Sequence, residues 1–277
     1  MTPFLKMHGL GNDFVVFDAR KQALALDDAA ARAIADRRHG IGCDQVIVIA
    51  SGRGTFDAVM KIQNADGGEV ESCGNAARCV AKLLMQESGR DSVRIDTVGG
   101  ALTCTKAEDG LVTVDMGAPK LMWDQVPLAR ATDTNLFRLN VDGKTYEASA
   151  VSVGNPHAVL FVEDADAAPV AELGPRIEHH PMFPARTNVE FVSQNRDDRL
   201  RMRVWERGVG ITSACGTGAC ATAVAAFRRG LTGRKVEVVL DGGSLFIELR
   251  AGDDHILMTG PATLAFRGEV DIEALKP

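Results

Sequence analysis

An internal repeat constrains the fold of this 277-residue chain more than any other feature of its sequence. The segment 73–79 (CGNAARC) returns 142 residues later as 215–221 (CGTGACA). Three other landmarks recur in the same order at an offset of 143 residues, namely Gly11-Asn12 as Gly154-Asn155, Gly99-Gly100 as Gly242-Gly243, and Gly117 as Gly260. Solenoid repeats are only ~20–50 residues long. The repeat therefore indicates two duplicated domains rather than an array.

The residue pattern predicts many short strands and one strongly apolar helix in each half. The expected strands are 45–49, 56–63, 150–153, 157–162, 189–192, 201–205, 236–240, 245–249 and 256–258. A short helix with an acidic start is expected from residue 27, ending near Gly40. The apolar helices are expected at 73–87, with Ser72 as its cap, and at 215–229. Gly89 and Gly230 end them, and the Gly99-Gly100 and Gly242-Gly243 pairs are expected to be turns.

Both long helices are apolar nearly all round, as buried helices are. We therefore predict an α+β fold of two similar domains, each a mixed β-sheet or barrel wrapped around a central helix. The first domain is expected to comprise 1–119 with the C-terminal tail 262–277, which returns as an edge strand. The second is expected to comprise 120–261, with 119–143 as the crossing between them.

Composition excludes several classes of protein. Apolar residues make up 45% and charged residues 25% of the chain, as in ordinary globular proteins. The net charge of −6 argues against a nucleic-acid-binding surface. No apolar run approaches the ~20 residues that span a bilayer, and the N-terminus lacks the order of a signal peptide. We expect a cytoplasmic protein with no membrane partner, whose six cysteines are reduced.

Cys73 and Cys215 each stand at the predicted start of a helix. There, unpaired backbone N–H groups and the helix dipole are expected to lower the thiol pKa from ~8.5 toward ~3.5–7.5. The same N–H groups can hold a carboxylate. If both ends grip one carboxylate, one sulfur can remove the α-proton as thiolate while the other delivers a proton to the opposite face. This pattern predicts a racemase or epimerase that needs no cofactor.

Other interpretations of the cysteines remain open. A buried cysteine is usually a small hydrophobic residue, and we expect that of Cys43, Cys79, Cys104 and Cys220. For Cys73 and Cys215 the alternatives are a disulfide or redox pair and a metal site. No C-x-x-C spacing supports a zinc ribbon or a thioredoxin-like motif.

Seven motifs, spread from residue 7 to residue 219, make the chain resemble the diaminopimelate epimerase family. They are 7–14 (MHGLGNDF), 64–67 (NADG), 73–75 (CGN), 154–157 (GNPH), 187–191 (TNVEF), 206–208 (ERG) and 214–219 (ACGTGA). Two positions depart from the family pattern: Ile211 stands where many members carry Glu, and Ala76 where many carry Gly.

The resemblance implies roles for individual residues. Cys73 and Cys215 would be the acid and base, and His157 and Glu206 would tune the thiol pKa values. Substrate would be bound by Asn12, Gln45, Asn64, Gly74, Asn75, Asn155, Asn188, Glu206, Arg207, Gly216 and Thr217. The resemblance further implies interconversion of LL- and meso-diaminopimelate for lysine and peptidoglycan synthesis, without pyridoxal phosphate or metal, by a homodimer.

Two rival functions differ in observable ways. A proline-type racemase should lack the set Asn64, Asn155, Asn188 and Arg207, because its substrate has no distal amino-acid end. A thiol redox or metal-binding protein is separable by titration of free thiols and by metal analysis.

Overall fold

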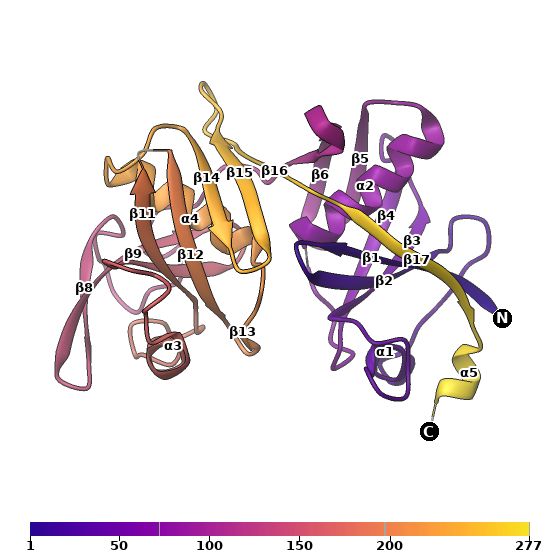
Figure 1. Cartoon of the computed structure of the whole chain (residues 1–277), viewed down its shortest axis with the longest axis horizontal. Helices are drawn as coiled ribbons and strands as arrows, with labels where there is room; N and C mark the ends of the chain where they lie inside the picture. The colour runs from indigo at the N-terminus through magenta and orange to yellow at the C-terminus, as the bar shows by residue number, and fades with distance from the viewer. Residues whose placement is uncertain (72, 197, 277) are drawn as a thin grey trace. The chain divides into compact units, whose positions relative to one another are not determined.

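The computed structural model of this chain describes residues 1–71, 73–196 and 198–276. The chain folds into two compact units, unit 1 with Met1–Asp115 and Thr259–Pro277, and unit 2 with Met116–Met258 (Figure 1). Each unit is a mixed sheet with few helices, so the predicted α+β class is confirmed. Among the described residues, none of the helices is long and apolar enough to span a membrane.

The strands of unit 1 have the ladder order β17–β1–β2–β3–β4–β5–β6–β7. The β2–β3 and β4–β5 pairs are parallel and the others antiparallel. The C-terminal tail supplies β17, which pairs with β1. The strands are β1 (Thr2–Gly9), β2 (Asn12–Asp18), β3 (Gln45–Ser51), β4 (Ala58–Asn64), β5 (Ser92–Thr97), β6 (Gly100–Lys106), β7 (Val112–Asp115) and β17 (Thr263–Val270).

Helix α2 (Gly74–Ser88) is the central helix of unit 1 and packs against β1, β5, β6 and β7 (Figure 1). Its first residues are all buried, from Gly74 through Ala81. Cys73 is the N-cap residue and Gly89, with φ 69°, ends the helix. The predicted cap Ser72 lies outside the described residues.

Smaller helical elements complete unit 1. Helix α1 (Asp28–Ala35) begins after Asp27, whose carboxylate accepts a hydrogen bond from the Ala30 N–H at 2.7 Å. The remaining elements are the 3₁₀ turn η1 (Glu108–Gly110) and the C-terminal helix α5 (Ile272–Leu275).

Unit 2 repeats this plan with the ladder order β8–β9–β10–β11–β12–β14–β15, and β13 also pairs with β12. Parallel pairs again stand at the matching places, β10–β11 and β12–β14. The chain leaves the unit within β16. The strands are β8 (Phe137–Val141), β9 (Lys144–Ser152), β10 (Pro156–Phe161), β11 (Asn188–Arg196), β12 (Arg199–Glu206), β13 (Gly210–Ile211), β14 (Lys235–Leu240), β15 (Gly243–Leu249) and β16 (Ile256–Gly260).

Helix α4 (Gly216–Arg228) is the buried helix of unit 2, and it packs against β9, β10, β11, β12, β14 and β15. Helix α3 (Val170–Glu178) packs against β11, β12 and β13. The interpretation of 119–143 as a crossing between domains is wrong. This segment belongs to unit 2, and Val126, Leu128 and Phe137 are buried in its hydrophobic core.

Both predicted glycine turns are confirmed as two-residue hairpin loops. Thr97 pairs with Gly100 across the β5–β6 turn, and Leu240 pairs with Gly243 across the β14–β15 turn. Gly100 and Gly243 have φ of 115° and 130°, which only glycine adopts without strain.

Candidate active site

The predicted site residues of unit 1 form two hydrogen-bonded groups, one at the start of α2 and one across the β3–β4 pair. The Asn75 amide donates to Asn12 Oδ1 at 3.1 Å, and Cys73 Sγ lies 3.9 Å from the same oxygen. Asn12 Nδ2 in turn donates to Asp44 at 2.9 Å. The next residue, Gln45, donates to Asn64 Oδ1 at 2.9 Å across the β3–β4 pair. The structure therefore brings Asn12, Cys73 and Asn75 together and pairs Gln45 with Asn64, and Asp44, which Asn12 contacts, is the neighbour of Gln45 in the sequence.

The N-terminus of α2 gives Cys73 its setting. Cys73 has extended backbone angles, φ −143° and ψ 109°, so the helix starts at Gly74. Its carbonyl accepts the first helical bond, from the Ala77 N–H at 2.9 Å. The N–H groups of Gly74 and Asn75 precede that bond and have no acceptor within the helix. They are suited to bind an anion.

Cys215 occupies the matching position in unit 2. It is the N-cap residue of α4, and its sulfur accepts a hydrogen bond from the Gly218 N–H at 3.3 Å. The hydroxyl of Thr217 lies 3.6 Å from the same sulfur. Unlike Cys73, which is half-buried, Cys215 is only 4% exposed.

The predicted lowering of the Cys215 pKa is wrong. Burial raises the pKa of the Cys215 thiol well above its usual range, and a negative charge on the nearby Glu206 or Glu190 carboxyl would raise it further. The hydrogen bonds from Thr217 and Gly218 act in the opposite direction but are outweighed. Cys215 is therefore a neutral thiol near neutral pH. For Cys73 the lowered pKa stays a prediction.

His157 lies in a chain of side chains that leads to Cys215. Its Nε2 is 2.9 Å from Asn155 Oδ1, and Asn155 Nδ2 donates to the Thr217 hydroxyl at 3.3 Å. Its Nδ1 is 2.6 Å from Glu190 Oε1. His157 and Glu190 are both fully buried. The structure therefore connects the predicted residues Asn155, His157 and Thr217 to Cys215.

Glu206 ends β12 and also interacts with Cys215. Burial raises the pKa of the Glu206 carboxyl, while hydrogen bonds with Thr212 and Cys215 and the charge of His157 lower it. The Thr212 hydroxyl donates to Glu206 Oε1. A carboxyl in contact with the thiol can exchange a proton with it. As a carboxylate it can also raise the thiol pKa by repelling the thiolate.

Asn188 and Arg207 are connected directly. Asn188 Oδ1 accepts from the Arg207 backbone N–H at 2.9 Å, and Asn188 Nδ2 donates to the Pro156 carbonyl at 2.9 Å. The Arg207 side chain is exposed and its guanidinium donates to the Ala185 carbonyl at 3.1 Å. Asn188 therefore ties the residue before His157 to the segment that carries Arg207.

Corresponding strand positions show that the two networks are duplicates. In unit 1, Phe14 of β2 pairs with Gln45 of β3. In unit 2, His157 of β10 pairs with Asn188 of β11, and both positions are shifted by 143 residues. The offset that relates Asn12 to Asn155 therefore also relates Gln45 to Asn188. Equivalent strand ends supply the site residues of each unit.

The sequence profile of diaminopimelate epimerase matches residues 4–122 and 149–265. The chain belongs to the diaminopimelate epimerase family. It is 55% identical over 275 residues to the diaminopimelate epimerase of Rhodospirillum centenum, and the aligned region covers 99% of this chain and 94% of that protein. It is 53% identical over 275 residues to that of Phenylobacterium zucineum, covering 97% of each.

Solved structures of other isomerases share the fold of this member of the diaminopimelate epimerase family. A probable proline racemase from Agrobacterium radiobacter K84 with bound carbonate superposes with a TM-score of 0.71 at 17% identity, covering 98% of this chain and 93% of that one. A hydroxyproline epimerase from Agrobacterium vitis with bound trans-4-hydroxy-L-proline gives a TM-score of 0.69 at 17% identity, covering 96% and 91%.

Sequence reasoning missed two buried carboxyls near the site of this diaminopimelate epimerase family member. Glu190 is bonded to His157, and Glu178 of α3 accepts from Trp205 Nε1 at 2.7 Å and from the Gly208 N–H at 3.0 Å. The available signal was a lone acidic residue between apolar neighbours, at Glu190 in β11. Buried carboxyls of this kind are rarely found without a partner.

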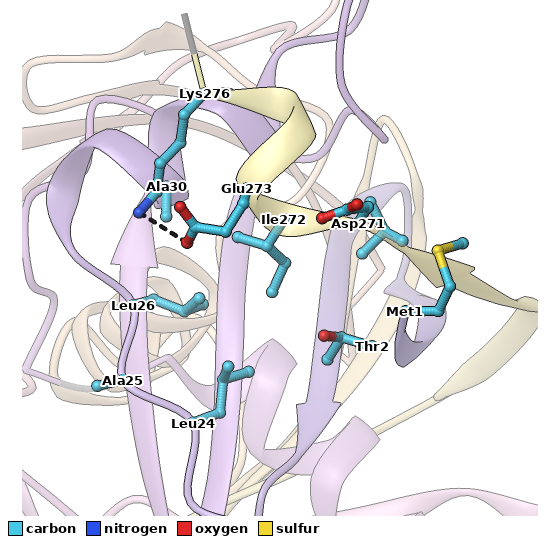
Figure 2. A pocket seen from close by; sticks show the side chains of 11 residues that line it. Met1, Thr2, Leu24, Ala25, Leu26, Ala30, Asp271, Ile272, Glu273 and Lys276 are labelled. Carbon is cyan, nitrogen blue, oxygen red and sulfur yellow. Dashed lines mark hydrogen bonds and ion pairs between the residues drawn. The ribbon is translucent and has the colours of Figure 1, made fainter.

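A cavity of about 180 Å³ in unit 1 lies apart from these networks (Figure 2). Leu24, Leu26 and Ile272 line it, together with Glu273 and Lys276, which form an ion pair at 3.1 Å. None of the predicted site residues, all of which the structure describes, lines this cavity. Within 1–71, 73–196 and 198–276, no cluster of three His, Cys, Asp or Glu side chains is placed to hold a metal ion.

Proposed function

We propose that this enzyme interconverts LL-2,6-diaminopimelate and meso-2,6-diaminopimelate by a two-base mechanism that uses Cys73 and Cys215. The observation that carries the proposal is the duplicated arrangement of a cysteine at the N-terminus of each buried helix, α2 and α4. Membership of the diaminopimelate epimerase family supports the choice of substrate.

In each direction one sulfur acts as thiolate and takes the α-proton. The electron pair of the C–H bond stays on the substrate as a carbanion, and the other cysteine gives its thiol proton to the opposite face. The configuration inverts and the two cysteines exchange protonation states. The raised pKa of Cys215 favours its thiol form, and we therefore propose it as the proton donor when the reaction starts from the resting enzyme.

The backbone N–H groups of Gly74, Asn75, Gly216 and Thr217 are proposed to hold the carboxylate next to the reacting carbon. This carboxylate gains negative charge in the transition state, and prearranged N–H donors stabilise such charge. His157 and Glu206 are proposed to tune the thiols, and Glu206 also to bind the substrate ammonium group.

Recognition of the distal amino-acid end is assigned to the remaining polar residues. Amide side chains can donate to a carboxylate and accept from an ammonium group. The exposed guanidinium of Arg207 can bind a carboxylate through two parallel hydrogen bonds. The side chains proposed for binding are Asn12, Gln45, Asn64, Asn155, Asn188 and Arg207.

The proposal extends to the cellular setting of the enzyme. We propose a cytoplasmic homodimer that serves lysine and peptidoglycan precursor synthesis and works without pyridoxal phosphate or metal. A chelator should therefore leave its activity unchanged, and activity that is lost to a chelator and restored by added metal would contradict this part.

Proton NMR in D₂O with separate amino acids tests the substrate assignment. We expect loss of the α-proton signal from LL- and meso-diaminopimelate and retention of it in L-proline, trans-4-hydroxy-L-proline and L-lysine. Lysine is the matched control, because it lacks only the distal carboxylate. Exchange of proline, or equal exchange of lysine, would contradict the assignment.

A further inference from the structure

The buried pair Glu190 and His157 lies behind Cys215. Glu190 Oε1 is 2.6 Å from His157 Nδ1, and neither side chain is exposed. The other carboxyl oxygen, Oε2, is buried and has no hydrogen-bond partner among the described residues. A full negative charge on this carboxyl would leave one charged oxygen unsatisfied in the interior, which is costly.

Gly218 allows Glu190 to approach Cys215 closely. A Cβ atom on Gly218 would lie 2.9 Å from Glu190 Oε1 and 3.2 Å from Cys215 Sγ. The carboxyl and the sulfur therefore face each other across the first turn of α4, where only glycine leaves the space open. A charged carboxylate here would oppose a thiolate at Cys215.

Hydrogen-bond donors and acceptors fix the direction of the chain that starts at this pair. Asn155 Nδ2 donates to Thr217, so its Oδ1 is the acceptor that faces His157 Nε2. Nε2 therefore carries a hydrogen. Thr217 accepts from Asn155 and keeps its own hydrogen, and Cys215 Sγ, 3.6 Å away, can act only as the acceptor of that hydrogen when it is a thiolate.

We propose that Glu190 is a positioning residue that, as a neutral acid, donates to His157 Nδ1 and starts a chain of hydrogen bonds directed at the Cys215 sulfur. The chain runs from Glu190 through His157, Asn155 and Thr217. Every member donates toward Cys215, so the Thr217 hydroxyl supports the sulfur when it has given up its proton. This inference rests on the proposed role of Cys215 in epimerisation.

The charged and titratable groups around the pair agree with a neutral Glu190. Glu206 of β12 and Cys215 at the start of α4 are the acidic groups that interact with it electrostatically. Burial raises the pKa of the Glu190 carboxyl, and the opposing effect of His157 is smaller. A neutral Glu190 leaves Cys215 facing one negative charge fewer.

Two substitutions with opposite expectations test the proposal. Glu190→Gln removes the acid but keeps the length of the side chain, and its amide N–H can replace the carboxylic O–H toward Nδ1. We expect its kcat for diaminopimelate to stay within about 3-fold of the wild type. Glu190→Asp keeps the acid but shortens the side chain by one methylene. We expect its kcat to fall about 10- to 100-fold, the loss for a hydrogen bond to a charged group, because the Thr217 hydroxyl is no longer directed at the Cys215 thiolate, and we expect KM to be unchanged.

NMR of the histidine nitrogens tests the direction of the hydrogen-bond chain in the absence of substrate. In protein with ¹⁵N-labelled histidine, the His157 signals are those that disappear in His157→Asn. We expect the tautomer with hydrogen on Nε2 in the wild type and in Glu190→Gln, and a mixture of tautomers in Glu190→Asp.

The outcomes separate the two proposals. Loss of activity in Glu190→Gln as large as in Glu190→Asp, or a hydrogen on Nδ1 in Glu190→Gln, would overturn the inference. A wild-type enzyme that does not epimerise diaminopimelate would overturn the proposed function instead. The histidine spectra would still test the direction of the hydrogen bonds from Glu190 to Cys215.

Discussion

Burial and helix position act in opposite directions on Cys215. A helix N-terminus stabilises a nearby negative charge by about 0.3–1 kcal/mol at exposed sites and up to about 2 kcal/mol in partly buried ones. Full burial of an ionisable group shifts its pKa by up to about 3–5 units, which corresponds to roughly 4–7 kcal/mol. Desolvation is the larger effect, so Cys215 stays protonated although its position in the sequence predicts a thiolate.

Arg207→Lys tests recognition of the distal carboxylate. The exposed guanidinium of Arg207 offers a planar pair of donors, and a lysine ammonium offers a single point of charge. Misplacing the distal end also shifts the α-carbon relative to the thiols. We expect kcat/KM for diaminopimelate to fall about 10- to 100-fold, the loss for a hydrogen bond to a charged group. Steady-state kinetics measure it.

A matched control for this variant is Arg199→Lys. Arg199 begins β12, the strand that ends at Glu206, and pairs with Glu237 at 3.1 Å. Its kinetics should equal those of the wild type. If Arg207→Lys also behaves as the wild type does, Arg207 does not contact the substrate.

Helix α3 holds the segment that carries Glu206 and Arg207. Glu178, only 2% exposed, accepts from Trp205 and from Gly208, which flank those two residues. The helix approaches closely because Gly174 faces the Trp205 ring, where a Cβ would come within 2.6 Å. This packing explains how α3 positions two proposed substrate-binding side chains without contacting substrate itself.

Glu178→Gln should loosen this segment. An amide oxygen can still accept from Trp205 or from Gly208, but its NH₂ group cannot accept at all. We expect kcat/KM to fall about 5- to 30-fold, corresponding to roughly 1–2 kcal/mol for one lost buried hydrogen bond. Enzyme kinetics and Trp205 fluorescence check it. Unchanged kinetics with altered fluorescence would mean that α3 does not control the position of Glu206 and Arg207.

The sequence predicted some elements of this fold and could not predict others, for physical reasons. Helices α2 and α4 were predictable because apolar residues fill most of their length and Gly89 and Gly230 follow them. Helix α3 was not, since Gly174 and Pro175 inside it are helix-breaking signals that the packing against Trp205 overrides.

The candidate site divides in the same way. Residues in motifs shared with the family, such as Asn155 and Arg207, could be proposed from the sequence. The role of Glu190 was not, because its partner His157 is 33 residues away and the two meet only through the pairing of β10 with β11. The neutral state of Cys215 depends on burial, which the sequence does not report.

The duplication extends from single residues to the order and direction of the strands in both units. Parallel pairs stand at equivalent places, and positions 14 and 45 correspond to 157 and 188. The two networks nevertheless differ in charge. Unit 2 places Glu190, His157 and Glu206 around its cysteine, whereas the side chains next to Cys73 are the amides Asn12 and Asn75, and the carboxylate of Asp44 is one hydrogen bond further away. The two thiols therefore lie at equivalent positions of the duplicated fold but next to different polar side chains.

Three buried cysteines should make unit 1 sensitive to alkali. Burial raises the pKa of Cys43 to about 11 and of Cys79 and Cys104 to about 12. In the unfolded chain these thiols lose their protons at a lower pH. Above the thiol pKa of the unfolded chain, the unfolded state therefore binds fewer protons than the folded state does. Stability therefore falls as pH rises through the window from about 9 to these values. At pH 10 each thiol should cost about 1.4 kcal/mol.

Urea unfolding of the wild type and of Cys79→Ala and Cys104→Ala measures this sensitivity. Both variants should be less stable than the wild type at pH 7, because they leave cavities. Between pH 8 and pH 10, however, each should lose about 1.4 kcal/mol less stability than the wild type. Parallel losses in all three proteins would contradict the assignment of alkaline sensitivity to the buried thiols.

The most direct test of the two-base mechanism is the position of deuterium early in the reaction. Wild-type enzyme converts LL-diaminopimelate in D₂O, and NMR and mass spectrometry follow recovered substrate and product separately. With Cys73 and Cys215 on opposite faces of the α-carbon, the product should carry deuterium while recovered substrate keeps its α-proton. Cys73→Ala and Cys215→Ala should each lose about 10²- to 10⁴-fold in rate. Recovered substrate that gains deuterium as fast as product forms, or either variant near wild-type rate, would contradict the account.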